Sequence, residues 1–487
     1  MLSLQSEGWL LRFAGTSSVP RKRGGVAAVL SLAITLIALA TLDLRGELPP
    51  ETINRIDTIV SKAMADASAP SISLAVVKDG KIAYVHAYGN ASLDAAAPAR
   101  PEMRYKIGSV SKQFMGMALM LLVQDGKVSL DDRVGRYLPS LTRAHDISIR
   151  QLLTHTSGYQ DFYPLDYVAP FMTHPATPEE ILDRWARKPL DFEPGTEWQY
   201  SNTNFVVAGR IVEKVTGSTL MAFLQERIFG PLGMKTPIDL DHQPLADTDP
   251  KGYTRFGRGP VRPVQPEAPG WLFGAGELAM TARDLALWDI GLLEGKLLRP
   301  GLMAEMIKPV ILKNGAPTHY ALGIGVSDAD GHPRLEHGGA VSGYVSSNSI
   351  WLDQGAAIAV FCNLDGSGAP ASISHQVAPL LLAEKLDPRA AAQLDQARRI
   401  FGQLQQGTID RSLITSDASF YFTPQVLSDA AASLKPLGTP ESFEQTNMGL
   451  RGGMTYRSFQ IKFSGGAVLH LSTFSVDDGK FAQYLIQ

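Results

Sequence analysis

Three short motifs in this sequence carry side chains suited to acyl transfer. The first is Ser109-Val110-Ser111-Lys112, in which a serine and a lysine stand three residues apart. In a helix this spacing places both side chains on the same face. A serine hydroxyl needs a neighbouring base to become a good nucleophile, and a lysine amine is such a base when burial lowers its pKa. We therefore predict that Ser109 is a nucleophile activated by Lys112.

The other two motifs offer a proton relay and a substrate-binding edge. Tyr200-Ser201-Asn202 follows a Pro194-Gly195 turn, and a loop tyrosine facing a cleft can relay a proton through its phenol. His337-Gly338-Gly339 precedes Ala340, and paired glycines let a substrate backbone approach a strand edge and pair with it. Taken singly, each motif also has a structural interpretation: a capping serine beside a solvated lysine, a packed tyrosine, and a surface histidine in a glycine turn.

Composition and motif searches exclude several other classes of chemistry. A single cysteine, Cys362, cannot form an intrachain disulfide or a cysteine-rich zinc site. The histidines do not cluster at metal-ligand spacing and no phosphate-binding glycine loop occurs, so we expect neither a metal nor a cofactor. The formal net charge of −3 argues against nucleic-acid binding. A Ser157–His155 dyad is not expected, because no Gly-x-Ser-x-Gly elbow surrounds that serine.

The N-terminal region has the pattern of an export signal. Arg21-Lys22-Arg23 precedes an uncharged stretch over residues 24–42, with small residues near a cleavage point after Ala40. The alternative is an uncleaved membrane anchor through residues 24–42, since this stretch is just long enough to span a bilayer. Both interpretations assign residues 1–44 to targeting. Both also place the rest of the chain in the periplasm or the extracellular space.

The elements that must position the motifs form an α/β domain over residues 45–386. Strand patterns at its two ends predict one antiparallel sheet flanked by helices, and a large helical insertion lies between them. The expected helices cover residues 51–67 and 373–385, the insertion covers residues 130–306, and the strands cover residues 72–77, 82–88, 347–352 and 357–363.

Local signals place each motif on an element. A helix is expected to begin at Ser109 and to end at Gly126, because the residues between them are apolar almost all round. Another helix follows the second motif over residues 204–215, and a strand follows the third over residues 342–346. The sequence of residues 387–487 predicts a small α+β domain without chemical motifs. Its expected helices cover residues 391–405 and 424–434, and its expected strands cover residues 455–463, 468–474 and 480–486.

Together and in this order, the three motifs resemble the serine β-lactamase and penicillin-binding protein superfamily. The resemblance is closest to class C β-lactamases and to related D-alanyl-D-alanine carboxypeptidases, D-aminopeptidases and esterases. It covers residues 51–386 and implies a β-lactamase-like fold. Flanking segments that share it are Lys106-Ile107-Gly108, Leu152-Leu153-Thr154-His155-Thr156-Ser157-Gly158, Gly274-Ala275-Gly276-Glu277-Leu278-Ala279-Met280-Thr281 and Tyr320-Ala321-Leu322-Gly323-Ile324-Gly325.

The resemblance implies a reaction in two steps. Ser109 would attack a carbonyl to form an acyl-enzyme, which water would then hydrolyse. Lys112 and Tyr200 would exchange the proton, and Asn202 would orient the substrate amide. The backbone N–H groups of Ser109 and Ala340 would stabilise the oxyanion.

One departure from the family pattern bears on the substrate. Class C β-lactamases carry a lysine-threonine-glycine triplet where this chain has His337-Gly338-Gly339. His337 replaces that lysine as a partner for a substrate carboxylate only when it is protonated, and its unperturbed pKa is about 6.5. The resemblance therefore implies a peptidase or esterase acting on D-amino-acid peptides or small esters, with weak activity on β-lactams. The alternative is a penicillin-recognising binding or cell-wall-associated protein with little turnover.

Overall fold

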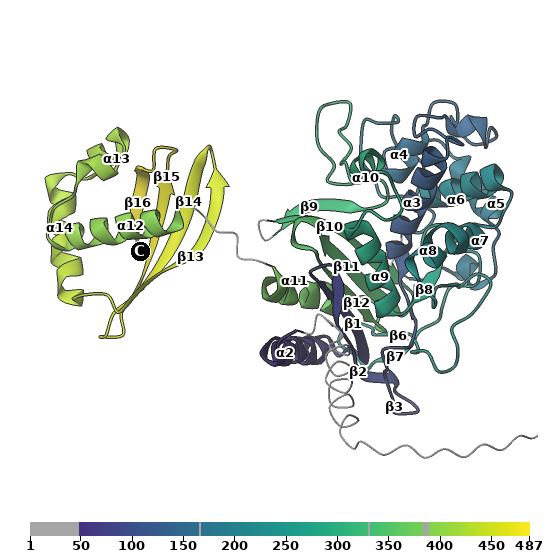
Figure 1. The fold of residues 1–487 in the computed structure, drawn as a ribbon, viewed down its shortest axis with the longest axis horizontal. Helices are drawn as coiled ribbons and strands as arrows, with labels where there is room; N and C mark the ends of the chain where they lie inside the picture. The colour runs from purple at the N-terminus through teal and green to yellow at the C-terminus, as the bar shows by residue number, and fades with distance from the viewer. Residues whose placement is uncertain (1–47, 165–166, 330–331, 383–388) are drawn as a thin grey trace, which may run out of the picture. The chain divides into compact units, whose positions relative to one another are not determined.

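The computed structural model describes residues 48–164, 167–329, 332–382 and 389–487. The chain divides between Ala383 and Glu384 into two compact units, each with its own core (Figure 1). The predicted targeting segment of residues 1–44 lies outside the described residues. Within the described ranges, no helix combines the length and the apolar character needed to cross a membrane.

The first unit is built on an antiparallel sheet whose described strands run in the order β3-β2-β1-β12-β11-β10-β9. Strands from the two ends of the unit are neighbours, because Ala75 of β1 lies opposite Ala359 of β12. The predicted α/β architecture, an antiparallel sheet flanked by helices, is confirmed. The strands are β1 (Ser71–Lys78), β2 (Lys81–Ser92), β3 (Ala97–Pro98), β9 (Gly325–Ala329), β10 (His332–Val341), β11 (Tyr344–Trp351) and β12 (Ala356–Cys362).

Both faces of the central strands are buried. In β1, Ile72, Leu74 and Val76 join one core cluster and Ala75 and Val77 join another, as alternation along a strand requires. Helices α2 (Pro50–Ala67) and α11 (Ala369–Leu381) cover the first face, and α9 (Ala282–Leu293) packs on the second (Figure 1). Helix α11 starts earlier than predicted because a proline fits its first turn.

The helical insertion surrounds the buried helix α3 (Ser111–Gln124). All but the last two residues of α3 are buried, which explains why its sequence is apolar almost all round. The predicted start at Ser109 was wrong by two residues, since Gly108–Val110 forms a 3₁₀ turn ahead of the helix. The other elements are α4 (Ile149–Leu153), α5 (Pro178–Ile181), α6 (Thr203–Thr216), α7 (Leu220–Leu224), α8 (Gly230–Leu232), α10 (Pro300–Met306), β4 (Tyr105–Lys106), β5 (Ile238–Asp239), β6 (Tyr253–Thr254), β7 (Arg262–Pro263) and β8 (Leu278–Met280).

The third motif lies inside strand β10 rather than before a strand. The predicted strand over residues 342–346 was wrong at its start, because Gly343 has φ +84° and makes the turn between β10 and β11. Strand β9 pairs only with residues 332–336 of β10. Among the described strands, none pairs with residues 337–341 on that side, so this half of β10 is a sheet edge.

The second unit packs helices on a four-stranded antiparallel sheet. Its core contains Phe401, Phe443, Phe459 and Phe481. Strand β13 was not predicted, because it is mostly exposed and polar and lacks an alternating apolar pattern. The elements are α12 (Ala390–Gln405), α13 (Ser416–Tyr421), α14 (Pro424–Leu434), β13 (Ser442–Arg451), β14 (Met454–Lys462), β15 (Val468–Ser475) and β16 (Phe481–Ile486).

Candidate active site

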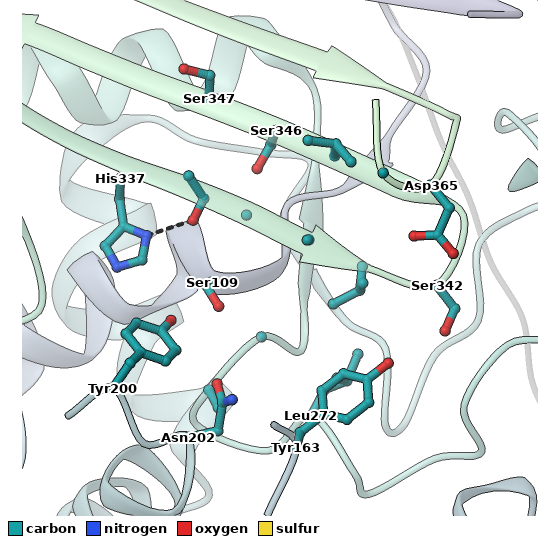
Figure 2. Close-up of a pocket in the computed structure, with 18 of the residues that line it drawn as sticks. Ser109, Tyr163, Tyr200, Asn202, Leu272, His337, Ser342, Ser346, Ser347 and Asp365 are labelled. Atoms are coloured by element: carbon teal, nitrogen blue, oxygen red, sulfur yellow. Dashed lines mark hydrogen bonds between the residues drawn. The ribbon is translucent and has the colours of Figure 1, made fainter. Parts of the chain in front are cut away.

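The three predicted motifs meet in one cleft of the first unit (Figure 2). The cleft has a volume of about 1090 Å³. Ser109 enters from the 3₁₀ turn before α3, Tyr200 and Asn202 from the loop before α6, and residues 337–341 from the uncovered half of β10. All the predicted site residues except the buried Lys112 line this cleft: Ser109, Tyr200, Asn202, His337, Gly338, Gly339 and Ala340.

Lys112 makes three polar contacts that define the state of its amine. Its Nζ lies 2.9 Å from Ser109 Oγ, 2.8 Å from Asn202 Oδ1 and 2.7 Å from the carbonyl oxygen of Ala275. An amide oxygen and a carbonyl oxygen can only accept hydrogen bonds. A neutral amine therefore donates its two N–H groups to these oxygens and keeps its lone pair for the proton of Ser109. This is the geometry of a general base.

The surroundings of Lys112 favour that neutral state. Burial lowers the pKa of Lys112 to about 7, although the carboxylates of Asp161 and Glu277 oppose this shift. Desolvation therefore outweighs the two charges. A substantial share of the amine is unprotonated at neutral pH, where an exposed lysine would be fully charged.

Tyr200 is held as a neutral phenol beside the nucleophile. Its hydroxyl lies on the side of Ser109 in the cleft (Figure 2), and burial raises the pKa of Tyr200 well above its ordinary value. The Lys112 amine lies 5.0 Å from the centroid of the tyrosine ring. A phenol that keeps its proton can donate it to a leaving group but is a poor base, so this arrangement suits Tyr200 to the predicted role of acid and Lys112 to that of base.

Asn202 is oriented by an aspartate that the sequence analysis did not single out. Asp161 Oδ1 accepts hydrogen bonds from the backbone N–H of Asn202 at 2.9 Å and from its Nδ2 at 3.1 Å. Because a carboxylate only accepts, Asp161 turns the amide nitrogen toward itself and the amide oxygen toward Lys112. No local sequence pattern identifies Asp161 as a site residue, because its hydrogen-bond partner Asn202 lies 41 residues further along the chain.

His337 lies in the cleft but in a setting that opposes a positive charge. Its Nδ1 lies 2.6 Å from the carbonyl oxygen of Gly338 (Figure 2). Its Nε2 lies 2.7 Å from the Tyr320 hydroxyl. Since the carbonyl only accepts, Nδ1 carries the proton and Nε2 accepts from Tyr320. Burial, with the nearby Lys112 amine, lowers the pKa of His337 to about 4. The expected role of a protonated His337 at neutral pH is therefore not favoured.

Two glycines let β10 pack closely against the turn Gly108–Val110, which carries Ser109 and is called the nucleophile turn below. A Cβ on Gly108 would lie 2.9 Å from the backbone nitrogen of Ala340, and one on Gly339 would lie 2.0 Å from the carbonyl oxygen of Ile107. Both approaches are too close for any side chain. The glycines therefore let the backbones of Ser109 and Ala340, where the oxyanion donors are predicted, come close together.

Acidic side chains outnumber basic ones along the cleft. Asp161, Glu336 and Asp365 line it, together with a single arginine, Arg255. The Arg255 guanidinium donates to Ser68 Oγ and to the carbonyl oxygens of Arg258 and Gly259. In the part of the chain that the structure describes, no group of three or more His, Cys, Asp or Glu side chains is arranged to hold a metal ion.

Comparison with known proteins identifies relatives for most of the first unit. A sequence model of the family described as Beta-lactamase matches residues 56–381. A D-aminopeptidase of Brucella anthropi is 29% identical over 326 residues, which cover 65% of this chain and 60% of that protein. A D-aminopeptidase of Brucella ovis is 27% identical over 352 residues, which cover 71% of this chain and 66% of that protein. The chain thus spans less than two thirds of the length of these curated relatives.

Solved structures show the same fold. The D-amino acid amidase from Ochrobactrum anthropi SV3 complexed with D-phenylalanine has a TM-score of 0.60 at 27% identity, covering 68% of this chain and 98% of that one. A D-stereospecific amidohydrolase from Streptomyces sp. has a TM-score of 0.57 at 27% identity, and the match covers 65% of this chain and 96% of that one. The octameric penicillin-binding protein homologue from Pyrococcus abyssi is 20% identical with a TM-score of 0.60, and the match covers 89% of this chain and 100% of that one. At this identity the match supports the fold alone.

These matches confirm three of the predictions made from the sequence: the resemblance, the fold class and the assignment to hydrolytic enzymes. The roles assigned to individual cleft residues remain predictions.

Proposed function

Because the chain belongs to the β-lactamase family of serine hydrolases, we propose that it hydrolyses D-amino acid amides and short peptides with a D-amino acid at the N-terminus. The observation that carries this proposal is the contact of 2.9 Å between the Lys112 amine and the Ser109 hydroxyl, with acceptors on the two other sides of the amine. In that arrangement the lone pair of the neutral lysine amine is directed to the serine hydroxyl and can accept its proton.

The reaction proceeds through an acyl-enzyme. Ser109 Oγ attacks the amide carbonyl while its proton passes to Lys112 Nζ, and the oxyanion is stabilised by the backbone N–H groups of Ser109 and Ala340. As the C–N bond breaks, the Tyr200 phenol donates a proton to the leaving amine and regains one from Lys112. Water then attacks the ester, and Ser109 recovers its proton as the acid is released.

The charges along the cleft support a substrate with a free amine. At neutral pH the cleft offers no fixed cation at His337 for a terminal carboxylate, whereas the carboxylates of Asp161 and Asp365 favour an ammonium group. This disfavours D-alanyl-D-alanine carboxypeptidase and β-lactamase activity relative to aminopeptidase or amidase activity. The printed names of the similar proteins, D-aminopeptidase and D-amino acid amidase, point the same way. Esters of the same D-aminoacyl groups are expected to react as well, because an ester carbonyl is less stabilised by resonance than an amide carbonyl and its alcohol needs less help from an acid to leave.

Labelling and a panel of substrates test the proposal. A fluorophosphonate should add its mass to Ser109 of the full chain, and Ser109→Ala should abolish both labelling and turnover. D-alanine amide should be hydrolysed faster than L-alanine amide, N-acetyl-D-alanine amide and a chromogenic cephalosporin. Labelling of Ser109 without turnover of any substrate would instead favour the binding-protein alternative. Turnover that survives Ser109→Ala would contradict the proposed nucleophile.

We also propose that the protein acts outside the cytoplasm, on the strength of the basic residues before the uncharged stretch 24–42. Fractionation of cells expressing the full chain should place activity in the periplasm, the medium or the membrane. Deleting residues 1–44 should move it to the cytoplasm, and equal distributions would refute the proposal.

A further inference from the structure

His155, in the loop after α4, contacts the backbone on both sides of Tyr200. Its carbonyl oxygen accepts a hydrogen bond from the Gln199 N–H at 3.0 Å, and its Nδ1 accepts one from the Ser201 N–H at 3.1 Å. One buried residue thus accepts hydrogen bonds from the backbone N–H groups of both residues that flank Tyr200. His155 is not among the residues that line the cleft, so it does not meet a substrate directly.

The imidazole also packs directly on the tyrosine ring. The ring centroids of His155 and Tyr200 are 4.2 Å apart, and His155 lies 4.8 Å from Tyr320 and 5.2 Å from Phe205 on other sides. Tyr320 in turn donates its hydroxyl hydrogen bond to His337. The Tyr200 ring is therefore confined by a buried aromatic group, with its hydroxyl directed to Ser109.

Two local features of His155 lower the stability of the folded protein. Its backbone has φ +57°, a left-handed conformation that residues other than glycine adopt only occasionally. Because Nδ1 accepts from Ser201, the proton of the neutral ring lies on Nε2, which has no hydrogen-bond partner in the described part of the chain. Burial lowers the pKa of His155 well below its usual range, so the ring stays neutral beside Lys112 and His337. Strain and an unpaired polar atom of this kind are typical of residues retained for a functional site.

We propose that His155 is a positioning residue that holds the Tyr200 hydroxyl against Ser109 for proton transfer. The inference rests on the proposed acyl-transfer reaction and assigns to the Thr154–Gly158 segment a role that the sequence alone did not indicate. His155 acts here only through Tyr200. Removing it should therefore lower kcat and the rate of Ser109 acylation, while KM stays nearly constant.

Two substitutions separate the hydrogen bond from the ring contact. His155→Phe keeps a ring but loses the acceptor for Ser201, and we expect kcat to fall about 100-fold, within the range for loss of acid–base catalysis. His155→Asn places an amide oxygen near the position of Nδ1 and tolerates positive φ, so it should retain kcat within about 10-fold. Thr154→Val serves as the matched control. Thr154 is buried in the same loop and hydrogen-bonds to Arg150 and Thr156, away from Tyr200.

A double-mutant cycle with Tyr200→Phe provides the decisive test, with p-nitrophenyl acetate and D-alanine amide as probes of the full chain. If His155 acts through Tyr200, His155→Phe should cost little more in the Tyr200→Phe background. Multiplicative losses, or a loss in Thr154→Val equal to that in His155→Phe, would overturn the positioning role. Thermal unfolding shows whether each variant folds, and if His155→Phe does not fold, failure of the folded His155→Asn to retain kcat also overturns it.

The two probes keep this inference separate from the proposed substrate. A non-additive cycle with the ester, in an enzyme inactive on D-alanine amide, would support His155 and contradict the D-amino acid amide proposal. An additive cycle in an enzyme active on both probes would overturn the inference alone. A parent protein that reacts with neither probe would overturn both.

Discussion

Lys112 and Ser109 illustrate how burial converts an ordinary residue pair into a reactive one. The amine can act as a base only when it is neutral, and its pKa is lowered to about 7 by burial. The cost of desolvation is partly offset by the hydrogen bonds to Asn202 and Ala275. The packing of this single side chain thus sets the pH range in which we expect the amine to be able to act as a base.

The first prediction concerns the acid limb of the pH profile. Below about pH 7 the amine is increasingly protonated, so kcat/KM for a neutral ester should fall with decreasing pH and level off above that value. Stopped-flow or steady-state assays from pH 5 to pH 9 on the full chain measure this. An acid limb near the ordinary lysine pKa, or no limb in this range, would show that Lys112 is not the base.

A second prediction concerns Asp161. The negative charge of Asp161 raises the pKa of Lys112, so Asp161→Asn should shift the acid limb to lower pH. It should also lower kcat, because the Asn202 amide loses the carboxylate that sets its orientation. Glu336→Gln is the matched control, since Glu336 lines the same cleft but pairs with Arg334. Equal shifts in the two variants would indicate a general effect of cleft charge.

A third prediction follows from the neutral state of His337. With a pKa of about 4, His337 does not change its charge between pH 5.5 and pH 8, a range set about 1.5 units above that value by the titration of a single group. The profiles for D-alanyl-D-alanine and D-alanine amide should therefore have the same shape in this range. A selective loss of turnover for the carboxylate-bearing dipeptide as pH rises would show that His337 holds that carboxylate when protonated.

At the scale of the elements, the close contact between β10 and the turn before α3 aligns the site. Gly339 cannot carry a side chain, because a Cβ there would lie 2.0 Å from the Ile107 carbonyl oxygen and 2.4 Å from Ser346 Oγ. The same Ser346 hydroxyl donates to the Ile107 carbonyl at 2.7 Å. Strand β11, strand β10 and the nucleophile turn are thus joined at one point.

A fourth prediction compares the two glycines of the motif. Gly339→Ala should reduce stability by about 1–3 kcal/mol through overpacking. It should also lower kcat by about 100-fold or more, because it moves the predicted oxyanion donors apart. Gly338→Ala should leave stability unchanged, since the nearest atom to its Cβ would be 3.9 Å away. Thermal unfolding and Ser109 labelling measure both effects, and equal destabilisation in the two variants would contradict this account.

The elements with strong local signals were predictable, and the contacts among distant residues were not. The hairpin of β1 and β2 was marked by Asp79-Gly80, both with positive φ, and α14 was predicted with its observed bounds. Strand β13 was missed because an exposed strand lacks the apolar alternation on which such predictions depend. The contact between Ser109 and Lys112 was predictable from their spacing within one turn.

The remaining site features depend on tertiary structure. Asp161 and His155 act on the loop before α6 from a different part of the chain, so no local pattern marks them. The charge state of His337 depends on its burial and on the Lys112 amine, neither of which is encoded near the glycine motif. Sequence patterns thus identified the candidate reacting groups that the fold brings together, whereas their electrostatic states required the fold.

At the scale of the whole molecule, the catalytic unit and the C-terminal unit have separate interiors. The core clusters of the first unit contain only residues between Leu48 and Leu381, and the third cluster runs from Ala397 to Tyr484. Every residue that lines the cleft belongs to the first unit. Each unit therefore has the apolar core needed to fold independently.

The fifth prediction is that residues 45–386 alone keep the chemistry of Ser109. This fragment should unfold cooperatively, react with a fluorophosphonate at the rate of the full chain and hydrolyse a small ester equally well. Residues 387–487 should form a folded domain of their own by circular dichroism. Loss of labelling in a folded fragment would assign an essential part of the site to the C-terminal unit.

The uncovered half of β10 has a consequence for solubility. An exposed strand edge can pair with the edge of another molecule and initiate aggregation, and soluble proteins usually protect such edges. Here residues 337–341 form part of the wall of the cleft, so we expect the residues around the cleft to limit the access of a second folded sheet to this edge. The enclosure of this strand in the proposed substrate cleft would thus also protect its edge from pairing with a second copy of the chain.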